Sequence, residues 1–214
     1  MNFEFSSDQM LLRDQARKFL ENEESVKKAR EVLEGDQTHD ESLWRSVVEM
    51  GWTATTIPEE FDGLGLGYLE LCVIAEELGR SLAPTPFSSS VYLATEALIN
   101  QGSKEQHQKY LPKLAAGEIV GTLAHTETTY SPSPENLNCE LSNNKLNGIK
   151  IAVTDGDVAN FAVVSAKEGD KVVLGLVDLA SKGVEITSQN TLNPSRSHAS
   201  IKFKDADAEI LGSS

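Results

Sequence analysis

The sequence predicts an α+β chain, with an all-helical N-terminal domain followed by an antiparallel β-barrel domain. Up to Gly117 the apolar residues recur at helical intervals, and from Glu118 onward they alternate with polar residues in short β-branched runs. Of the 214 residues, 39% are hydrophobic and 24% are charged, which is typical of a chain that buries a core. We therefore expect a helical domain over residues 1–117 and a β-barrel domain over residues 118–214.

Capping residues and helix breakers divide the first domain into helices. Capping-box spacings at Ser6–Gln9 and Ser103–Gln106 begin the first and last of them, and Asp40 is the expected N-cap of a helix that Gly51 ends. Gly79 lies inside another helix as a weak point or a close-packing site. The expected helices span about residues 7–22, 41–50, 68–82, 90–100 and 104–116, with a Pro84–Pro86 break before the fourth.

The second domain is predicted to consist of short strands separated by turn residues such as Asn-Asn and Ser-Lys-Gly. Their regular spacing, without a long helical insert, favours a sandwich or small barrel over a parallel α/β sheet. The expected strands are Ile119–His125, Lys145–Thr154, Asn160–Ala166, Val172–Asp178, Gly183–Ser188, His198–Phe203 and Ala208–Leu211.

The charge balance narrows the classes of partner. The chain has 19 Lys and Arg residues against 33 Asp and Glu residues, a formal net charge of −14 at pH 7 and a pI of about 4.7. Because such a protein repels a phosphate backbone and an anionic membrane surface, we expect neither nucleic acid nor membrane as a partner. There is no signal-peptide pattern and no run of about 18 apolar residues. These features predict a cytoplasmic protein.

The sequence gives no sign of a metal centre, a disulfide or a nucleophilic serine. Cys72 and Cys139 are isolated, and we expect both to be buried thiols. No Gly-x-Ser-x-Gly pentapeptide is present to place a serine nucleophile. Metal-ligand spacing is absent among the histidines, which are His39, His107, His125 and His198.

Two other patterns could carry chemistry, and each has a simpler interpretation. The glycine-rich segment Gly63–Gly67 could bind a phosphate, but no apolar strand precedes it, so we interpret it as a helix connection. Glu76 and Glu77 could act as a general acid and base, but adjacent helical residues diverge by about 100°. We expect a solvated or salt-bridged helix face there.

Four blocks of sequence stand out along the chain: Ile57–Gly67, Val73–Arg80, Tyr110–Glu118 and Leu146–Ala166. They are similar, in this order, to a P-E-x-x-G-G-x-G turn, an E-E-L-G/A helix, a K-x-x-x-L-P-x-L-x-x-G-E segment and an L-N-G-x-K-x-W-I-T-N-G-x-x-A-D-x-x-x-V-x-A stretch. All four belong to the acyl-CoA dehydrogenase family. The chain resembles that family over its whole length.

The resemblance implies a reaction and a cofactor. Family members have a helical domain, a middle β barrel and a C-terminal four-helix bundle, with FAD held between barrel and bundle; this chain matches the first two. A glutamate of the bundle removes the α-proton of an acyl-CoA while the β-hydrogen passes to the flavin, giving a trans-2-enoyl-CoA. Electrons then pass to an electron-transfer flavoprotein. Because that glutamate belongs to the bundle, no residue of this chain is assigned a catalytic role.

The resemblance also implies which residues contact the flavin: Leu123, His125, Thr126, Val153 and Thr154. Thr126 matches the threonine of the family's x-T-E-P-x-x-G-S-D stretch, and Thr154 matches that of W-I-T. Two departures stand out. After Glu127 the family's proline and glycine-flanked serine are absent from Thr128–Ser133, and Ala152 replaces the tryptophan that covers the ring. We expect another side chain over that face, a wider pocket or weaker flavin binding.

Three functions remain open. The leading prediction is the N-terminal and middle part of an acyl-CoA dehydrogenase of fatty acid metabolism, inactive as a fragment alone. The alternative is a non-catalytic flavin-binding or interaction subunit, whose partner chain supplies the glutamate and the bundle. The third is an oxidase or monooxygenase on the same fold, because an open face at Ala152 suits oxygen access. These hypotheses are compatible with a homo-oligomer and with a partner chain that supplies the C-terminal domain.

Overall fold

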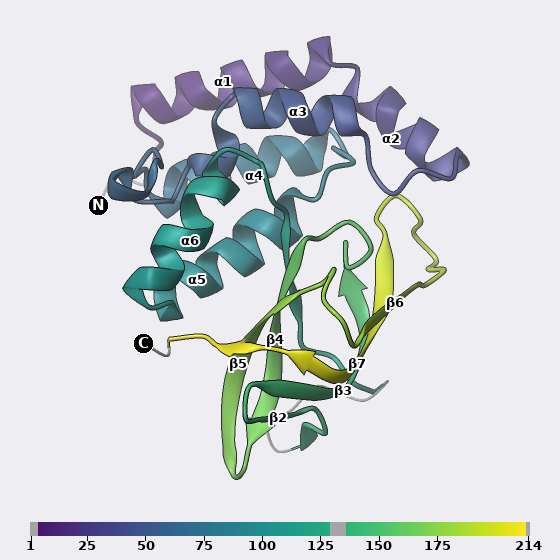
Figure 1. Ribbon diagram of the computed structural model, residues 1–214. Helices are drawn as coiled ribbons and strands as arrows, with labels where there is room; N and C mark the ends of the chain where they lie inside the picture. The colour runs from purple at the N-terminus through teal and green to yellow at the C-terminus, as the bar shows by residue number, and fades with distance from the viewer. Residues whose placement is uncertain (1–3, 129–135, 213–214) are drawn as a thin grey trace.

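The computed structural model describes residues 4–128 and 136–212, in which a helical part is followed by a curled sheet (Figure 1). This arrangement confirms the predicted α+β fold class. The helices are α1 (Ser7–Asn22), α2 (Ser25–Glu34), α3 (Glu41–Glu49), α4 (Tyr68–Arg80), α5 (Glu96–Gln101) and α6 (Lys104–Ala115), with 3-10 turns η1 (Trp52–Ala54) and η2 (Glu59–Phe61) and a π-helical segment η3 (Ser88–Thr95). The strands are β1 (Gly121–Ala124), β2 (Glu140–Ser142), β3 (Lys145–Thr154), β4 (Phe161–Glu168), β5 (Lys171–Asp178), β6 (Val184–Ser188), β7 (His198–Asp207) and β8 (Glu209–Ile210).

Most helices begin where the capping residues predict. Ser6 and Ser103 form reciprocal capping boxes at α1 and α6, and the Asp40 carboxylate accepts a hydrogen bond from the backbone N–H of Leu43 at the start of α3. The sequence does not predict α2. Its N-cap residue Glu24 is left-handed and makes no capping hydrogen bond, so no capping pattern marks the start of this helix. The helix predicted over residues 90–100 begins earlier and is π-helical in its first turns.

The strands form one sheet in the order β6-β7-β3-β2-β4-β5-β8, and β1 pairs with β4 beside β2. Most ladders are antiparallel, as predicted, but β1 and β2 both run parallel to β4, so the sheet is mixed. A long connection rather than a hairpin turn follows β1, which lets it lie alongside β4 in the same direction. The sequence does not predict the three-residue strand β2.

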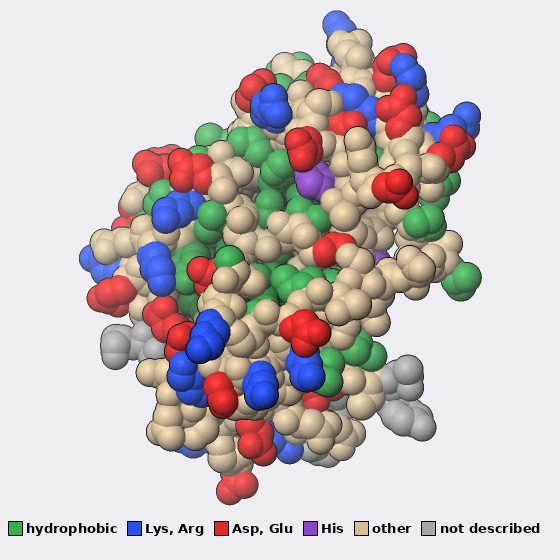
Figure 2. All heavy atoms as spheres, turned by 45° about the vertical axis from the view of Figure 1, so that its right-hand side comes forward, with side chains coloured by type: hydrophobic (Ala, Val, Ile, Leu, Met, Phe, Trp, Pro, Cys, Tyr) green, Lys and Arg blue, Asp and Glu red, His purple; other side chains and the backbone are tan. Residues whose placement is uncertain are grey.

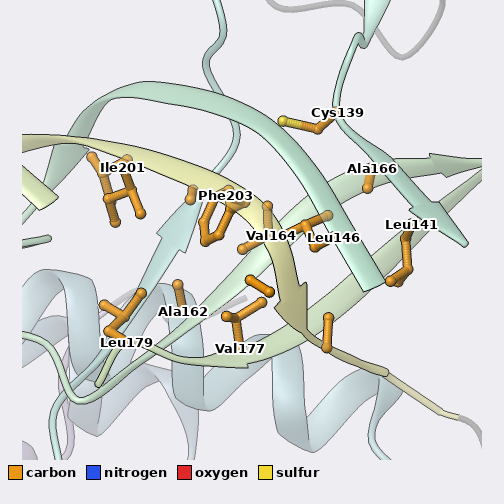
Figure 3. Packing of buried hydrophobic residues seen from close by; sticks show 14 residues of the cluster. Cys139, Leu141, Leu146, Ala162, Val164, Ala166, Val177, Leu179, Ile201 and Phe203 are labelled. Atoms are coloured by element: carbon orange, nitrogen blue, oxygen red, sulfur yellow. The ribbon is translucent and has the colours of Figure 1, made fainter. Parts of the chain in front are cut away.

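Two apolar clusters hold the sheet. The inner one fills the curl of the sheet and includes Leu146, Val164 and Phe203 (Figure 3). The second joins the two parts of the chain, because Leu98 and Leu111 from the helices pack with Phe161, Val163 and Leu176 from the outer side of the strands. Burial of large apolar side chains stabilises such a junction by about 1.5–3 kcal/mol each. The helical part is therefore fixed against the sheet.

Two glycines of the helical part have opposite surroundings. A Cβ on Gly63 would lie 1.8 Å from the backbone oxygen of Ile57, whereas a Cβ on Gly79 in α4 would meet no atom within 4 Å. Gly79 is therefore a weak point of the helix and not a close-packing site. We expect Gly63→Ala to destabilise the fold by about 2 kcal/mol through overpacking, and Gly79→Ala to stabilise it by about 0.5–1 kcal/mol. Urea unfolding of both variants tests this, and equal effects of the two substitutions would contradict it.

Candidate functional site

The segment 122–126, which includes most of β1, lies alongside residues 151–154 at the end of β3, although about thirty residues separate the two segments in sequence. The backbone N–H of Ile151 donates to the carbonyl of Thr126 over 2.8 Å, and the Thr122 hydroxyl donates to the carbonyl of Thr154 over 2.7 Å. Two hydrogen bonds thus join the segments that the sequence predicts to hold the cofactor. Because the two segments run antiparallel, Thr126 and Thr154 lie at opposite ends of this paired stretch.

The residues predicted to bind the cofactor differ in what they offer a ligand. Thr126 and Thr154 are half-buried, and each can present a hydroxyl. Leu123 packs against the apolar cluster between helices and sheet, and the Val153 side chain is only 1% exposed inside the curl of the sheet. Contacts of Val153 with a ligand would therefore go through its backbone. The threonines are the residues best placed for polar contacts.

A buried lysine, Lys150, lies behind the Thr126 segment. Its ammonium group on β3 is 0% exposed and donates to Glu127 Oε1 over 2.7 Å, to Ser165 Oγ over 3.1 Å and to the carbonyl of His125 over 3.1 Å. An ammonium has three donors, so this set uses all of them. Lys150 therefore holds the backbone carbonyl before Thr126 and the side chain after it. The motifs in the sequence do not single out Lys150, although its place in the L-N-G-x-K pattern was the available signal.

Glu127 ties the two ends of a long connection together. Its carboxylate accepts the backbone N–H of Asn138 over 2.5 Å and that of Cys139 over 3.0 Å. Burial alone would raise the pKa of Glu127, but the hydrogen bonds from Lys150 and from these backbone groups outweigh it and lower the pKa to about 2. Residues 129–135 of the connection, where the chain departs from the family pattern, lie outside the described residues.

The same network includes His125. Ser165 Oγ accepts a hydrogen bond from the Lys150 ammonium and lies 2.9 Å from His125 Nδ1. This contact orients the imidazole ring in the segment that includes Thr126.

The position of the missing tryptophan has an unusual backbone. Ala152 is exposed and lies in the left-handed region with φ of 51°, at an irregularity in the β3–β7 register. Its backbone N–H donates to Gln189 Oε1 over 2.8 Å, so the 189–197 connection approaches the strand here. The Gln189 side chain therefore lies against the backbone of Ala152.

A cavity of about 250 Å³ lies between α4, the 82–88 segment and the connection that includes Arg196. Arg196 Nη1 donates to Ser88 Oγ across it, and the half-buried Tyr92 side chain lines one wall, with the pKa of its hydroxyl raised by burial to about 12. Its other walls come from α4 and from the 82–88 segment, including Leu78 and Phe87. A larger cavity of about 580 Å³ between α6 and the strands is lined by none of the predicted site residues.

The remaining expectations have mixed outcomes. Glu77 forms the expected inter-helix salt bridge, with Arg17, and Gly63–Gly67 connects η2 to α4. Both thiols are free, but Cys72 is exposed rather than buried because it lies on the outer face of α4.

Within residues 4–128 and 136–212 no group of His, Cys, Asp and Glu could hold a metal ion.

No helix in the described part of the chain has both the length and the apolar composition needed to cross a bilayer.

On the face shown in Figure 2, acidic and basic side chains are interspersed over both parts of the molecule. The net charge of −14 is therefore not gathered into one patch on that face.

Comparison with known proteins identifies the class. A family model described as "Acyl-CoA dehydrogenase, N-terminal domain" matches residues 6–118. The chain is 37% identical over 134 residues to the mitochondrial isovaleryl-CoA dehydrogenase of Solanum tuberosum, an alignment that covers 60% of this chain and 32% of that protein. The aligned part of the chain therefore spans about a third of that relative's length.

Solved structures share the fold over nearly the whole chain. The glutaryl-coenzyme A dehydrogenase–glutaryl-CoA complex has a TM-score of 0.90 at 21% identity, covering 100% of this chain and 58% of that one. The ChsE4-ChsE5 complex of Mycobacterium tuberculosis has a TM-score of 0.85 at 24% identity, covering 99% and 57%. An acyl-CoA dehydrogenase complexed with FAD from Bacillus anthracis has a TM-score of 0.83 at 24% identity, covering 98% and 38%.

These matches define the class as the helical and β-sheet portions of acyl-CoA dehydrogenases. The chain belongs to the acyl-CoA dehydrogenase family.

Proposed function

We propose that this chain is the N-terminal and middle part of an FAD-dependent acyl-CoA dehydrogenase, which oxidises an acyl-CoA thioester to a trans-2-enoyl-CoA and passes electrons to an electron-transfer flavoprotein. The observation that carries the proposal is the pairing of the Thr126 and Thr154 segments through two hydrogen bonds. In the family pattern these two threonines serve the same cofactor, so their placement at the two ends of one paired stretch supports a common ligand that extends along it.

The residues present fit the edge of a flavin. Two half-buried hydroxyls can donate, the His125 imidazole is a further hydrogen-bonding group, and the Lys150 network holds the segment that bears Thr126 and His125. A flavin, when bound, supplies the hydride acceptor for the reaction. The net negative charge of the chain repels an anionic cofactor. Local neutral hydrogen-bond donors are therefore the groups suited to hold it. The protein's own contribution is to orient the ring with groups on rigid strand ends.

Acyl-CoA is the proposed substrate class, and the 250 Å³ cavity beside α4 is a suitable place for an acyl chain. Its apolar wall residues, such as Leu78 and Phe87, match an aliphatic group, and Arg196 in its lining offers a positive charge. No residue of this chain is proposed as the catalytic base. That role belongs to a glutamate of the four-helix bundle, which the 57–58% coverage of the solved relatives does not include.

Anaerobic titration with a panel of acyl-CoAs tests the proposal. The purified protein, first loaded with FAD, is mixed with each thioester while the flavin absorbance is followed. We expect bleaching with at least one thioester when the bundle is present, either in the same polypeptide or in a partner. A flavin-loaded complex that contains the bundle glutamate and is bleached by none of them would contradict dehydrogenation.

The second candidate is a non-catalytic flavin-binding or interaction subunit that functions with a partner chain. It is favoured by the likeness of this chain to the ChsE4-ChsE5 complex, whose name records two different subunits. Co-purification discriminates the two candidates. A stable complex that binds flavin but is not reduced by any acyl-CoA supports the second candidate, and reduction by one of them contradicts it.

Thr154→Val is expected to weaken FAD binding about tenfold, because a lost hydrogen bond to a ligand costs about 1–1.5 kcal/mol. The measurement is the dissociation constant of FAD, obtained from the quenching of flavin fluorescence. Thr187→Val on β6, where the side chain is exposed and one strand, β7, separates it from β3, is the matched control. Equal FAD affinities of wild type and Thr154→Val would remove the Thr154 hydroxyl from the site.

A further inference from the structure

Directly after Thr154, a carboxyl group is buried between the sheet and the helical part. Asp155 is 2% exposed, and its Oδ2 lies 2.6 Å from the hydroxyl oxygen of Ser89 in η3. Ser89 is itself 0% exposed, and the same hydroxyl oxygen lies 3.0 Å from the carbonyl of Pro86. One short chain of oxygen atoms thus joins the end of β3 to the start of the π-helical segment.

The number of protons available to these three oxygen atoms depends on the protonation state of Asp155. A serine hydroxyl has one proton, while a carbonyl and an ionised carboxylate are both acceptors only. If Asp155 were ionised, Ser89 could donate to Oδ2 or to Pro86, and the other acceptor would remain without that bond. If Asp155 is protonated, its O–H donates to Ser89 Oγ and Ser89 donates to the Pro86 carbonyl. Both observed distances are then hydrogen bonds.

The charged groups around Asp155 do not form an ion pair with it. Arg196 and His198 from the 189–198 connection and β7, and His39 from the α2–α3 connection, face it and favour the ionised form. Within residues 4–128 and 136–212, however, no Lys, Arg or His nitrogen lies within 4.0 Å of its carboxyl oxygens, and Arg196 donates to Ser88 instead. Burial is the largest influence and raises the pKa of Asp155.

The sequence pattern supports the same protonation state. The family stretch quoted above has T-N-G where this chain has Thr154-Asp155-Gly156. An asparagine amide would donate to Ser89 Oγ through its NH₂ group, and a neutral aspartic acid is the isostere that donates through its O–H. Ionised aspartate can only accept. The proton therefore lets the aspartate take the place of an amide.

We propose that Asp155 is a neutral carboxylic acid in the folded protein, whose proton completes a hydrogen-bond chain from the end of β3 through Ser89 to Pro86. Asp155 is a positioning residue: it ties the strand end that carries Thr154 to the helical part. That it thereby orients a flavin-contacting group rests on the proposed function. The protonation state itself does not, and it can be measured without any cofactor.

The direct test is a pH titration of the aspartate side-chain ¹³C signals by NMR, with Asp155 assigned by its absence in Asp155→Asn. We expect the Asp155 carboxyl to stay protonated at pH values well above the ordinary aspartate pKa of about 3.9. A midpoint at or below that ordinary value would overturn the proposal.

Unfolding measurements supply the second readout. Because a raised pKa favours the neutral form, wild type and Asp155→Asn should be similarly stable below the unfolded pKa of about 4. As the pH rises to the folded pKa, the unfolding constant of wild type should grow by up to about tenfold per pH unit relative to Asp155→Asn, and then level off. Asp155→Ala should be less stable than Asp155→Asn at every pH. A parallel pH profile for wild type and Asp155→Asn would contradict a raised pKa, whatever the outcome of flavin binding.

Discussion

Lys150→Met is expected to destabilise the protein by about 3–5 kcal/mol, the largest effect of any single substitution considered. The variant removes a fully buried ammonium and leaves the Glu127 carboxylate without its cation, at a site where only 7% of that side chain is exposed. Ser165 and the carbonyl of His125 lose a donor as well. Chemical unfolding in urea at pH 7 measures the loss.

Two further variants separate the charge effect from general damage. Lys145→Met on the same strand removes a half-exposed pair with Asp207 and should cost less than about 1 kcal/mol. The double variant Glu127→Gln with Lys150→Met should recover part of the loss, since no unpaired buried charge remains. Additive effects of the two substitutions would contradict the coupling.

The same pair predicts a response to acid. The folded pKa of Glu127, about 2, lies below the unfolded value of about 4.3, so its stabilisation is present above pH 4.3 and is lost as the pH falls toward 2. The shift corresponds to about 3 kcal/mol. Glu127→Gln should show a correspondingly smaller loss of stability in this pH range.

Arg17→Ala is expected to destabilise the helical part by about 3 kcal/mol. Arg17 on α1 donates to both carboxylate oxygens of Glu77 on α4, over 2.6 and 2.9 Å, and the Glu77 side chain is 0% exposed. These hydrogen bonds lower the pKa of Glu77. Without the guanidinium, the ion pair that this buried carboxylate keeps among the described residues is with Arg80, at 4.0 Å. Thermal and urea unfolding measure the change.

The control is Arg13→Ala on the same helix. Arg13 pairs with its neighbour Asp14 at the surface, and both side chains are substantially exposed. Its removal should cost less than about 1 kcal/mol. Comparable losses for Arg13→Ala and Arg17→Ala would show that helix α1 tolerates no truncation, and would contradict a specific role of the buried pair.

Local signals predicted the elements that carry strong caps or periodicity. The Ser6 and Ser103 capping boxes and the long alternation of β3 all occur as expected. The sequence did not predict α2 or β2. α2 begins at a left-handed Glu24 without a side-chain cap, so no capping signal marks its start, and β2 has only three residues, too few for an alternating pattern. The parallel pairing of β1 with β4 depends on contacts between distant residues, which local pattern does not encode.

The candidate site was predictable in its threonines and not in what holds them. Thr126 and Thr154 follow from a motif, and the fold brings their segments together. Lys150 and Asp155 take their roles from burial and from partners as far away as Ser89 and Ser165. A buried lysine or a protonated aspartate cannot be distinguished from an exposed one by sequence alone, because the surroundings determine the charge state.

The central claim, that the paired segments carrying Thr126 and Thr154 hold a flavin, is tested most directly by titrating FAD into the purified, folded protein and following flavin fluorescence. The account predicts saturable quenching that Thr154→Val and Thr126→Val each weaken and that Thr187→Val does not. Protein that is folded by circular dichroism and shows no saturable FAD binding, or binds it equally well after both substitutions, would contradict the account.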